Sequence, residues 1–171
     1  MEENMKKMTE KALSEAFAGE SMAHMKYLIF AEIAEKDGYP NIARLFKATA
    51  FAEFAHAKNH ARNLGYIKQT EGNLDTGIDG ETFEVDEMYP AYLSTAMLQK
   101  EKGAEMAINY ALAAEKIHAA YYKQAKDTVQ GEKDMKIEEI YVCPVCGFTH
   151  IGAAPEKCPV CNAPKAKLNK F

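Results

Sequence analysis

Two pairs of a glutamate and a histidine share one spacing, and this spacing is suited to chemistry on a helix. Glu53 is followed three residues later by His56, and Glu115 is followed three residues later by His118. Residues at i and i+3 are neighbours on a helix, so each pair presents a carboxylate and an imidazole on one face. Two such motifs, with single glutamates on two other helices, are typical of a di-iron carboxylate site inside a four-helix bundle.

The candidate ligands of this site extend beyond the two motifs. They are Glu20, Glu53, Glu81, Glu84, Glu115, His56 and His118. Burying each carboxylate in an apolar bundle costs on the order of several kcal/mol. Two divalent cations offset this cost better than protonation does, and carboxylate with imidazole suits iron or manganese. A solvated helix face is the better explanation of a single pair, but it does not explain two pairs with a further glutamate in an apolar stripe and the Glu81-x-x-Glu84 spacing.

Four more side chains could approach this site, and each has a simpler explanation. His24 and His60 each lie four residues after a candidate ligand, although a histidine on a helix is more often a packed or surface residue. Tyr27 and Tyr89 could hydrogen-bond the carboxylates or a peroxide. Aromatic packing in the core is an equal alternative for both tyrosines.

A second candidate metal site lies near the C-terminal end, where all the cysteines form two Cys-x-x-Cys pairs. These residues are Cys143, Cys146, Cys158 and Cys161. In a reducing cytosol this clustering indicates a metal rather than disulfides. Two such pairs form a tetrahedral four-thiolate site, which favours zinc or iron. Structural zinc is one interpretation. Iron is the functional one, because a one-electron centre beside a di-iron site makes chemical sense.

The residues around the cysteines support this interpretation. Gly147 and Asn162 each follow a cysteine pair, where the backbone often needs a positive φ. His150 is not needed as a ligand, because four cysteines already complete the shell.

Composition limits the other functions of the chain. Its 171 residues are 47% hydrophobic and 27% charged, as in a globular protein. The net charge of −4 comes without a basic patch, so nucleic acid is not an expected partner. No run of 18 apolar residues could span a membrane. The first residues are too charged for a signal peptide, and we expect a cytoplasmic protein.

Hydrophobic periodicity and breaker residues predict four helices and a short tail. The helices are expected at residues 9–36, 40–64, 81–101 (interrupted at Pro90) and 104–129. Residues 66–80 contain three glycines and little periodicity, and we interpret them as a crossover long enough to traverse a bundle. A polar hinge at 131–136 divides a helical domain, residues 1–136, from a cysteine-bearing domain, residues 137–171.

The positions of the acids test this layout, because residues at equal depth in a helical hairpin lie equally far from its turn. The midpoint of Glu20 and Glu53 falls beside Gly38, which is expected to end the first helix. The midpoint of Glu84 and Glu115 falls near the second expected turn, at residue 103. Both hairpins therefore bring their acids to a common depth.

Several stretches resemble one family along nearly the whole chain. They are AFAGESMAHMKYLIFA, AEFAHAKNH, GETFEVDEMYP, AEKIHA and CPVCGF with the later CPVC. These stretches resemble rubrerythrin. The resemblance implies a mainly α protein, a ferritin-like four-helix bundle with a small C-terminal rubredoxin-like domain. It further implies a non-haem di-iron peroxidase that reduces hydrogen peroxide to water, with electrons passed from a rubredoxin-type centre with one iron and four cysteines.

The resemblance also implies roles for the candidate ligands. Glu53 and Glu115 match glutamates that bridge two irons, and Glu81 and His118 match the ligands of one of them.

Three ligands are implied for the other iron. Glu20 matches a constant ligand, Glu84 a ligand of the oxidised state and His56 a ligand of the reduced state. Tyr27 and Tyr89 match tyrosines that hydrogen-bond the site.

The four cysteines match the iron ligands of rubredoxin, and the one local departure is Asn162, where rubredoxins usually have glycine. This difference could alter hydrogen bonds to sulfur and so the potential, but not ligation.

The resemblance implies partners as well. Family members are usually homodimers in which the rubredoxin centre of one chain serves the di-iron site of the other, and some exchange helices between subunits. Electrons would come from rubredoxin or an NAD(P)H-dependent reductase. The chain has no Gly-x-Gly-x-x-Gly fingerprint, so we do not expect it to bind the nucleotide itself.

Two other functions compete with the peroxidase. One is a ferroxidase or iron-storage protein of ferritin type, against which the cysteine tail argues, since a storage cage needs no such electron donor. The other is a scaffold or regulator with structural zinc in its tail. Cage-sized assembly would favour the first, and zinc without the red colour of an iron tetrathiolate would favour the second.

Overall fold

The computed structural model describes residues 5–171. Residues 1–4, part of the charged N-terminal stretch considered above, lie outside the described residues. Helices dominate the chain, as the hydrophobic periodicity predicts. The chain divides into two compact units, Met1–Lys68 and Gln69–Phe171.

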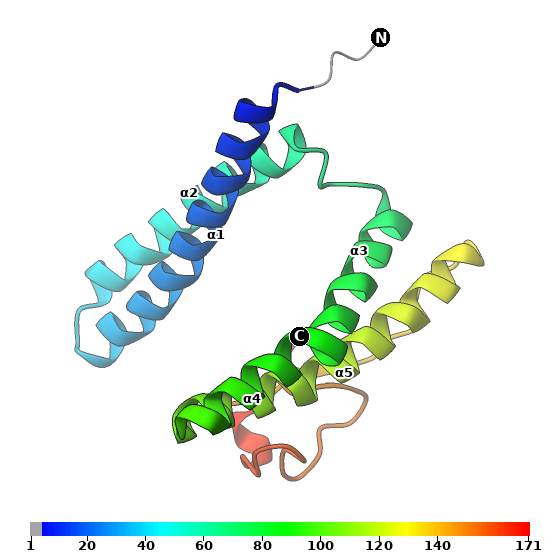
Figure 1. The fold of residues 1–171 in the computed structure, drawn as a ribbon. Coiled ribbons are helices and arrows are strands. Elements are labelled where there is room, and N and C mark those ends of the chain that lie inside the picture. The colour runs from blue at the N-terminus through cyan, green and yellow to red at the C-terminus, as the bar shows by residue number, and fades with distance from the viewer. Residues whose placement is uncertain (1–4) are drawn as a thin grey trace. The chain divides into compact units, whose positions relative to one another are not determined.

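The first unit is a hairpin of α1 (Lys7–Lys36) and α2 (Pro40–Asn63), which lie side by side in Figure 1. Gly38, with φ of +81°, makes the turn, and Pro40 begins α2, where its missing N–H has no helical partner to lose. The core of the hairpin consists of small residues, including Ala31 and Ala43, both fully buried. Alanines at the contact let the two helices approach closely. The predicted bounds of both helices are confirmed to within about two residues, the usual uncertainty of a helix end.

Large apolar side chains of this hairpin remain exposed. Met25 is 56% exposed, Ile29 52% and Phe51 72%. Large exposed apolar side chains can belong to an interaction surface. Residues 5–171 leave these three side chains of the hairpin uncovered.

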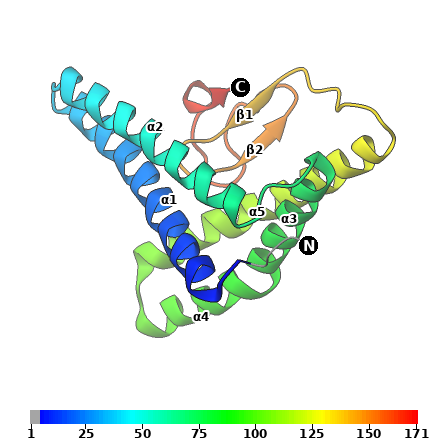
Figure 2. The same ribbon diagram turned by 90° about the horizontal axis from the view of Figure 1, so that it is seen from above.

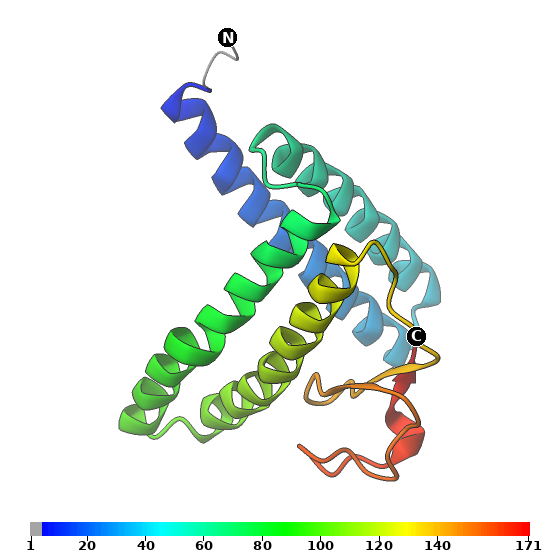
Figure 3. The same cartoon turned by 90° about the vertical axis from the view of Figure 1, so that its right-hand side faces the viewer.

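The second unit contains a longer hairpin. Its first arm is α3 (Thr70–Phe83), a π-helical segment (Glu84–Met88) and α4 (Tyr89–Gln99), and its second arm is α5 (Lys102–Gln130). Figure 3 shows the two arms side by side and joined at one end. Both arms pack through small residues such as Ala96, Ala114 and Ala119.

The predicted crossover at residues 66–80 is wrong, because α3 already begins at Thr70. Its glycines lower helix propensity, but packing against α5 outweighs this. Gly77 is an example, since a Cβ there would lie 3.2 Å from the ring of Tyr122 on α5. Gly77 therefore argued against a helix in the sequence, yet in the structure it permits the close approach of α3 and α5. Only residues 64–69 connect α2 to α3.

Two features of the second hairpin also differ from prediction. Pro90 does not interrupt a helix, because it occupies the first turn of α4, where no N–H partner is required. The turn between α4 and α5 lies at Lys100, with φ of +60°, and not at Gly103, which falls inside α5. The midpoint of Glu84 and Glu115 falls between residues 99 and 100, and it lies closer to the observed turn than Gly103 does.

The C-terminal part of the second unit is a small three-stranded antiparallel sheet (Figure 2). Its strands are β1 (Ile140–Val142), β2 (Thr149–Ile151) and β3 (Asn169–Lys170), in the order β2-β1-β3. A 3₁₀ turn, Lys165–Lys167, precedes β3. Cysteines and Phe148 form its core, and Tyr110 and Ile117 of α5 pack against that core. The cysteine region thus docks on α5 of its own chain.

Candidate metal centres

The four cysteines lie together as free thiols with the geometry of a metal site. The Sγ atoms of Cys143 and Cys161 are 3.5 Å apart, as are those of Cys146 and Cys158. Ligands on a tetrahedral metal with bonds of about 2.3 Å would be separated by about 3.8 Å. Disulfide bonds of about 2.05 Å would be far shorter. The donor set therefore fits one tetrahedral iron or zinc ion.

Two equivalent backbone turns hold the thiols. Gly147 N–H donates to Cys143 O at 2.9 Å, and Asn162 N–H donates to Cys158 O at 2.9 Å. The expected positive φ is confirmed at both turn residues, +78° at Gly147 and +62° at Asn162. Asparagine tolerates this conformation better than other residues with a side chain. Asn162 therefore completes the same turn that glycine makes after the first pair.

The two thiols of the first Cys-x-x-Cys pair differ in acidity. Burial raises the pKa of Cys143, but hydrogen bonds from the backbone N–H groups of Val145 and Cys146 outweigh it and lower the pKa to about 7. Burial raises the pKa of Cys146 above its usual range. A metal ion binds thiolates, so its entry displaces the protons that these buried thiols retain.

In the first unit, Glu20, Glu53 and His56 form the first half-site, a cluster whose ligand atoms lie within 4.8 Å of one another. His56 Nδ1 is 2.9 Å from Glu53 Oε2 and 3.8 Å from Glu20 Oε1. The side chain of His56 is 56% exposed, whereas that of Glu53 is 18% exposed. One helix supplies the motif pair, and the other helix supplies the additional acid.

In the second unit, Glu81, Glu115 and His118 form the second half-site. His118 Nδ1 is 2.6 Å from Glu115 Oε2 and 3.9 Å from Glu81 Oε1. These two distances nearly repeat those of the first half-site. The similarity follows from the shared spacing, since each imidazole lies one turn after its own carboxylate and faces one acid on the neighbouring helix.

The acids of the second half-site show the electrostatic cost that their burial predicts. Burial, followed by a hydrogen bond and charge from Glu115, raises the pKa of Glu81 to about 7. Burial and the charge of Glu115 also raise the pKa of Glu84. Glu84 lies near this cluster without joining its ligand atoms. A cation bound here would remove the repulsion that raises these pKa values.

The tyrosines and the additional histidines occupy different surroundings. Burial and then the charges of nearby glutamates, Glu84 first, raise the pKa of Tyr89, which places this phenol beside the second half-site. Tyr27 packs against Phe46 at 6.0 Å between ring centroids, and within residues 5–171 its hydroxyl forms no hydrogen bond. His24 Nδ1 lies 2.7 Å from Ala50 O, so it is a packed residue of the hairpin.

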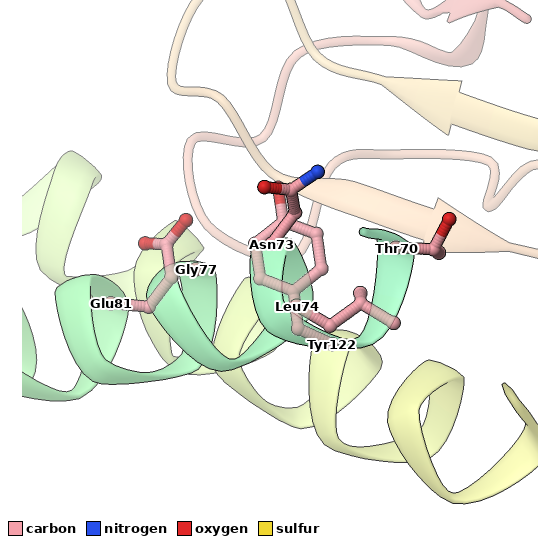
Figure 4. A pocket seen from close by; sticks show the side chains of 6 residues that line it. All are labelled: Thr70, Asn73, Leu74, Gly77, Glu81 and Tyr122. Atoms are coloured by element: carbon pink, nitrogen blue, oxygen red, sulfur yellow. The ribbon is translucent and has the colours of Figure 1, made fainter. Parts of the chain in front are cut away.

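A pocket opens beside the second half-site. It has a volume of 390 Å³ and is lined by Glu81, Gly77, Tyr122 and residues at the start of α3. Figure 4 shows Glu81 at one end and Thr70 at the other.

Sequence reasoning did not identify one contact of the second half-site. His118 Nε2 lies 2.8 Å from Thr149 Oγ1 on β2 of the cysteine region. The two residues are 31 positions apart on elements of different type. No periodicity or motif relates them, so only the docking of the cysteine region brings them together.

A mainly helical chain with carboxylate–histidine half-sites and a four-cysteine centre defines a class, the ferritin-like di-iron proteins fused to a rubredoxin-like domain. The family model for rubrerythrin matches residues 11–126, and the model for the rubredoxin-like domain of rubrerythrin matches residues 141–169. The chain belongs to the rubrerythrin family.

Individual relatives agree with this assignment. Rubrerythrin-2 of Clostridium acetobutylicum is 46% identical, covering 96% of this chain and 97% of the relative. Nigerythrin of Nitratidesulfovibrio vulgaris is 37% identical, covering 93% and 84%. The structure of fully reduced, all-ferrous nigerythrin aligns with a TM-score of 0.57 at 32% identity, covering 99% of this chain and 89% of that chain.

These findings confirm the predicted fold class and cofactors. The chain is mainly α and ferritin-like, with a rubredoxin-like four-cysteine iron site and carboxylate and histidine groups for a di-iron site. The family generally comprises peroxide-reducing oxidoreductases that act with electron donors such as rubredoxin. None of the helices that the structure describes has the length and apolar character needed to cross a membrane.

Proposed function

We propose that this protein reduces hydrogen peroxide to water at a di-iron site and draws electrons through its rubredoxin-type centre. The observation that carries the proposal is the matched geometry of the two half-sites, each with an imidazole between two carboxylates. Iron bound there supplies electrons and Lewis acidity for cleavage of the O–O bond. The reaction consumes two electrons and two protons per peroxide.

The ligand roles implied by the family are proposals for these residues. Glu53 and Glu115 would bridge the two metal ions, and each lies closest to the histidine of its own helix. Glu81 and His118 would bind one ion. These residues are only 18% to 26% exposed in their side chains, which suits permanent ligands.

The other ion would have a less fixed set of ligands. Glu20 would bind it throughout, while Glu84 and His56 would exchange with oxidation state. The exposure of His56 favours this difference, because a half-exposed ring can turn away from the site. Glu84 begins a π-helical segment, and such segments occur frequently at functional sites.

Proton supply would involve the phenols. Because burial and nearby carboxylates raise the pKa of Tyr89, its hydroxyl retains its proton and can donate a hydrogen bond to a carboxylate or to peroxide. Tyr27 would act similarly in the first unit after a rotation away from its packed position against Phe46.

We also propose where the electrons come from. The donor would be rubredoxin or an NAD(P)H-dependent reductase in the cytoplasm. The exposed cysteine edge supports such an exchange, because Val145, between two of the ligands, is 51% exposed. A small exposed apolar side chain next to a redox centre allows a partner to approach it closely.

The domain division at residues 136 and 137 stays a proposal as well. It is supported by the end of α5 at Gln130 and the start of β1 at Ile140, with no helix or strand between them. The two domains would nevertheless act together, because the cysteine region docks on α5.

We further propose a homodimer that exchanges helical hairpins. In a ferritin-like bundle, one long crossover joins two parallel helices. If α2 and α3 were parallel with Glu53 and Glu81 at one depth, the end of α2 and the start of α3 would lie at opposite ends of the bundle. The connector would then have to run back about 32 Å along the bundle, at about 1.5 Å per helical residue. Residues 64–69, fully extended, reach about 25 Å. The connector is therefore too short to return α3 to its own α1–α2 hairpin in that arrangement.

The exposed apolar faces support the exchange. Phe51 and Met25 in the first unit, and Leu98 and Tyr92 in the second, are each more than half exposed. Burial of such side chains stabilises by about 1.5–3 kcal/mol each. A second copy of the chain would cover both faces at once and bring a first half-site to a second half-site.

The reaction is tested by anaerobic reduction followed by one equivalent of peroxide per di-iron site. We expect complete two-electron reoxidation of the di-iron site, which absorption spectroscopy measures. Glu53→Ala and Glu115→Ala are expected to abolish it while the red tetrathiolate absorption remains. Reoxidation of these variants at the wild-type rate would show that the ligand assignment is wrong. Mineralisation of added iron instead of peroxide turnover would show a ferritin-type activity.

A further inference from the structure

We infer that Thr149 is a positioning residue that holds the ring of His118 through an N–H on Nε2 and so directs Nδ1 to a metal ion. The observation is the 2.8 Å contact between His118 Nε2 and Thr149 Oγ1. The inference rests on the proposed function only in taking the second half-site as a metal site. It makes the cysteine region part of the structure that prepares this site.

The direction of the hydrogen bond between His118 and Thr149 follows from the number of protons that the hydroxyl and the imidazole carry. A threonine hydroxyl has a single proton, and Thr149 donates it to Gly147 O at 3.1 Å. Toward His118 the hydroxyl is therefore an acceptor, so Nε2 must carry an N–H. With an N–H on Nε2, Nδ1 is the ring nitrogen whose lone pair a metal ion would use.

This tautomer is the one that the half-site needs. Nδ1 faces Glu115 Oε2 at 2.6 Å and Glu81 Oε1 at 3.9 Å. The 2.6 Å contact is a hydrogen-bonding distance, so a metal ion that binds here would replace this hydrogen bond and use the lone pair of Nδ1. In metal sites the second ring nitrogen is commonly fixed by such a hydrogen bond, which sets both tautomer and orientation.

The cysteine region holds Thr149 firmly in this position. Gly147 lies against α5, since a Cβ there would be 3.5 Å from Ala114 Cβ. The backbone N–H of Ile151 donates to Tyr121 Oη at 3.2 Å. These contacts lie on either side of Thr149 along the chain, so β2 is tethered to α5 (Figure 2).

Within residues 5–171, the first half-site has no equivalent of Thr149. Nε2 of His56 makes no hydrogen bond to any residue that the structure describes, and the side chain is 56% exposed. The side chain of His118 is 26% exposed. Only one of two otherwise similar half-sites therefore has a fixed imidazole, and the fixed one adjoins the electron-supplying centre.

Thr149→Val tests the inference in the full chain, because valine keeps the shape and the β-branching that suit β2 but lacks the hydroxyl. Iron is first loaded into the four-cysteine site, and Co²⁺ is then titrated into the carboxylate sites by visible absorption. We expect affinity for the second half-site to fall about 10- to 100-fold. Thr149→Ser, which keeps the hydroxyl, should restore most of it.

Thr128→Val is the matched control, since the hydroxyl of this threonine on α5 donates to Gln124 O of its own helix. Its Co²⁺ affinity should equal that of the unmodified protein. A second readout is the Nε2–H signal of His118 in ¹⁵N NMR of the full chain loaded with Zn²⁺. This proton should exchange slowly with water in the unmodified protein and rapidly in Thr149→Val.

The outcomes separate the inference from the proposed function. If Thr149→Val changes only the melting temperature, leaving Co²⁺ affinity and Nε2–H exchange unaltered, Thr149 is a structural tether and the inference is wrong. If the unmodified protein fails to react with peroxide but Thr149→Val still weakens Co²⁺ binding, the inference stands and the peroxidase proposal fails.

Discussion

At the scale of single residues, each half-site brings negative charge together in a partly buried position. Glu81 shows the consequence, since its pKa of about 7 lies well above the ordinary value of 4.5. Burial is the first cause and the neighbouring Glu115 is the next. The metal-free protein therefore holds a carboxyl group that folding makes harder to ionise.

This raised pKa predicts how the stability of metal-free protein depends on pH. Between about pH 4.5 and 7 the folded state binds more protons than the unfolded state, so the free energy of unfolding falls as pH rises. Glu81→Gln should flatten this dependence, because glutamine does not titrate. The measurement is urea unfolding of chelator-treated protein at several pH values.

Glu87→Gln is the control for this prediction, because Glu87 is an exposed acid on the π-helical segment. It should keep the pH dependence of the unmodified protein. An equal slope for Glu81→Gln and the unmodified protein would show that Glu81 does not carry the effect.

The residues of the half-sites could be predicted from sequence for a local reason. The motif pair Glu115 and His118 is fixed by helix geometry alone, and the structure places the two within hydrogen-bonding distance. Thr149 could not be predicted, because its contact depends on how a separate sheet docks on α5. The fixed orientation of Tyr27 against Phe46 was equally beyond the reach of periodicity.

At the scale of elements, helix ends were predictable where a residue type has one conformational use. Gly38 ends α1 with a positive φ, as expected. At the second turn the same logic selected Gly103, but the chain reverses at Lys100 in a left-handed conformation that disfavours lysine. Glycine allows a turn but does not require one. Treating Gly103 as the end of a helix therefore placed the turn three residues too late.

The position of this turn predicts the effects of two substitutions. Lys100→Gly should stabilise the protein by about 1 kcal/mol, because glycine adopts the left-handed conformation without strain. Gly103→Ala should also stabilise it, by about 0.5–1 kcal/mol, because position 103 is helical and a Cβ there meets nothing within 4 Å. Chemical denaturation measures both effects.

The second substitution decides between the two positions of the turn. A turn at residue 103 would make Gly103→Ala destabilising, since alanine is strained at positive φ. Gly38→Ala serves as the reference for that strain, because Gly38 has φ of +81° and open space around it.

Pro90 was predicted to interrupt a helix. It does not, but it still changes the helix that precedes it. Proline removes the N–H that would bond four residues back, and it disfavours a regular helix on its N-terminal side. The chain widens into a π-helical segment, Glu84–Met88, immediately before it, and Tyr89 N–H donates to Glu84 O. The helix continues with altered register instead of breaking, and the change of register falls at a candidate ligand.

At the scale of the whole molecule, the fold class could be predicted but the connection between the units could not. Three glycines made residues 66–80 appear unstructured, whereas packing on α5 makes most of them helical. The connector between α2 and α3 is therefore only residues 64–69, shorter than the predicted crossover. This correction supports the proposed exchange of hairpins, because six residues are too few to return α3 to its own α1–α2 hairpin in a ferritin-like bundle.

The exchange predicts complementation between two inactive variants. Glu53→Ala removes a ligand from the first half-site and Glu115→Ala removes one from the second. In an exchanged dimer with one chain of each kind, one site combines both defects and the other has none. Co-refolding equal amounts of the two variants should therefore restore about a quarter of the peroxide-driven reoxidation, because about half of the dimers are mixed.

A dimer without exchange, or an up-down-up-down monomer that a short connector also permits, gives the opposite result. Every site then contains one of the two defects, and co-refolding restores nothing. Co-refolding each variant with itself is the control for recovery, and the red absorption of the four-cysteine centre reports that all chains have refolded. Loss of the restored activity on dilution to the monomer would confirm that both chains supply ligands to one site, because the half-sites of a separated chain cannot meet across residues 64–69 in a ferritin-like bundle.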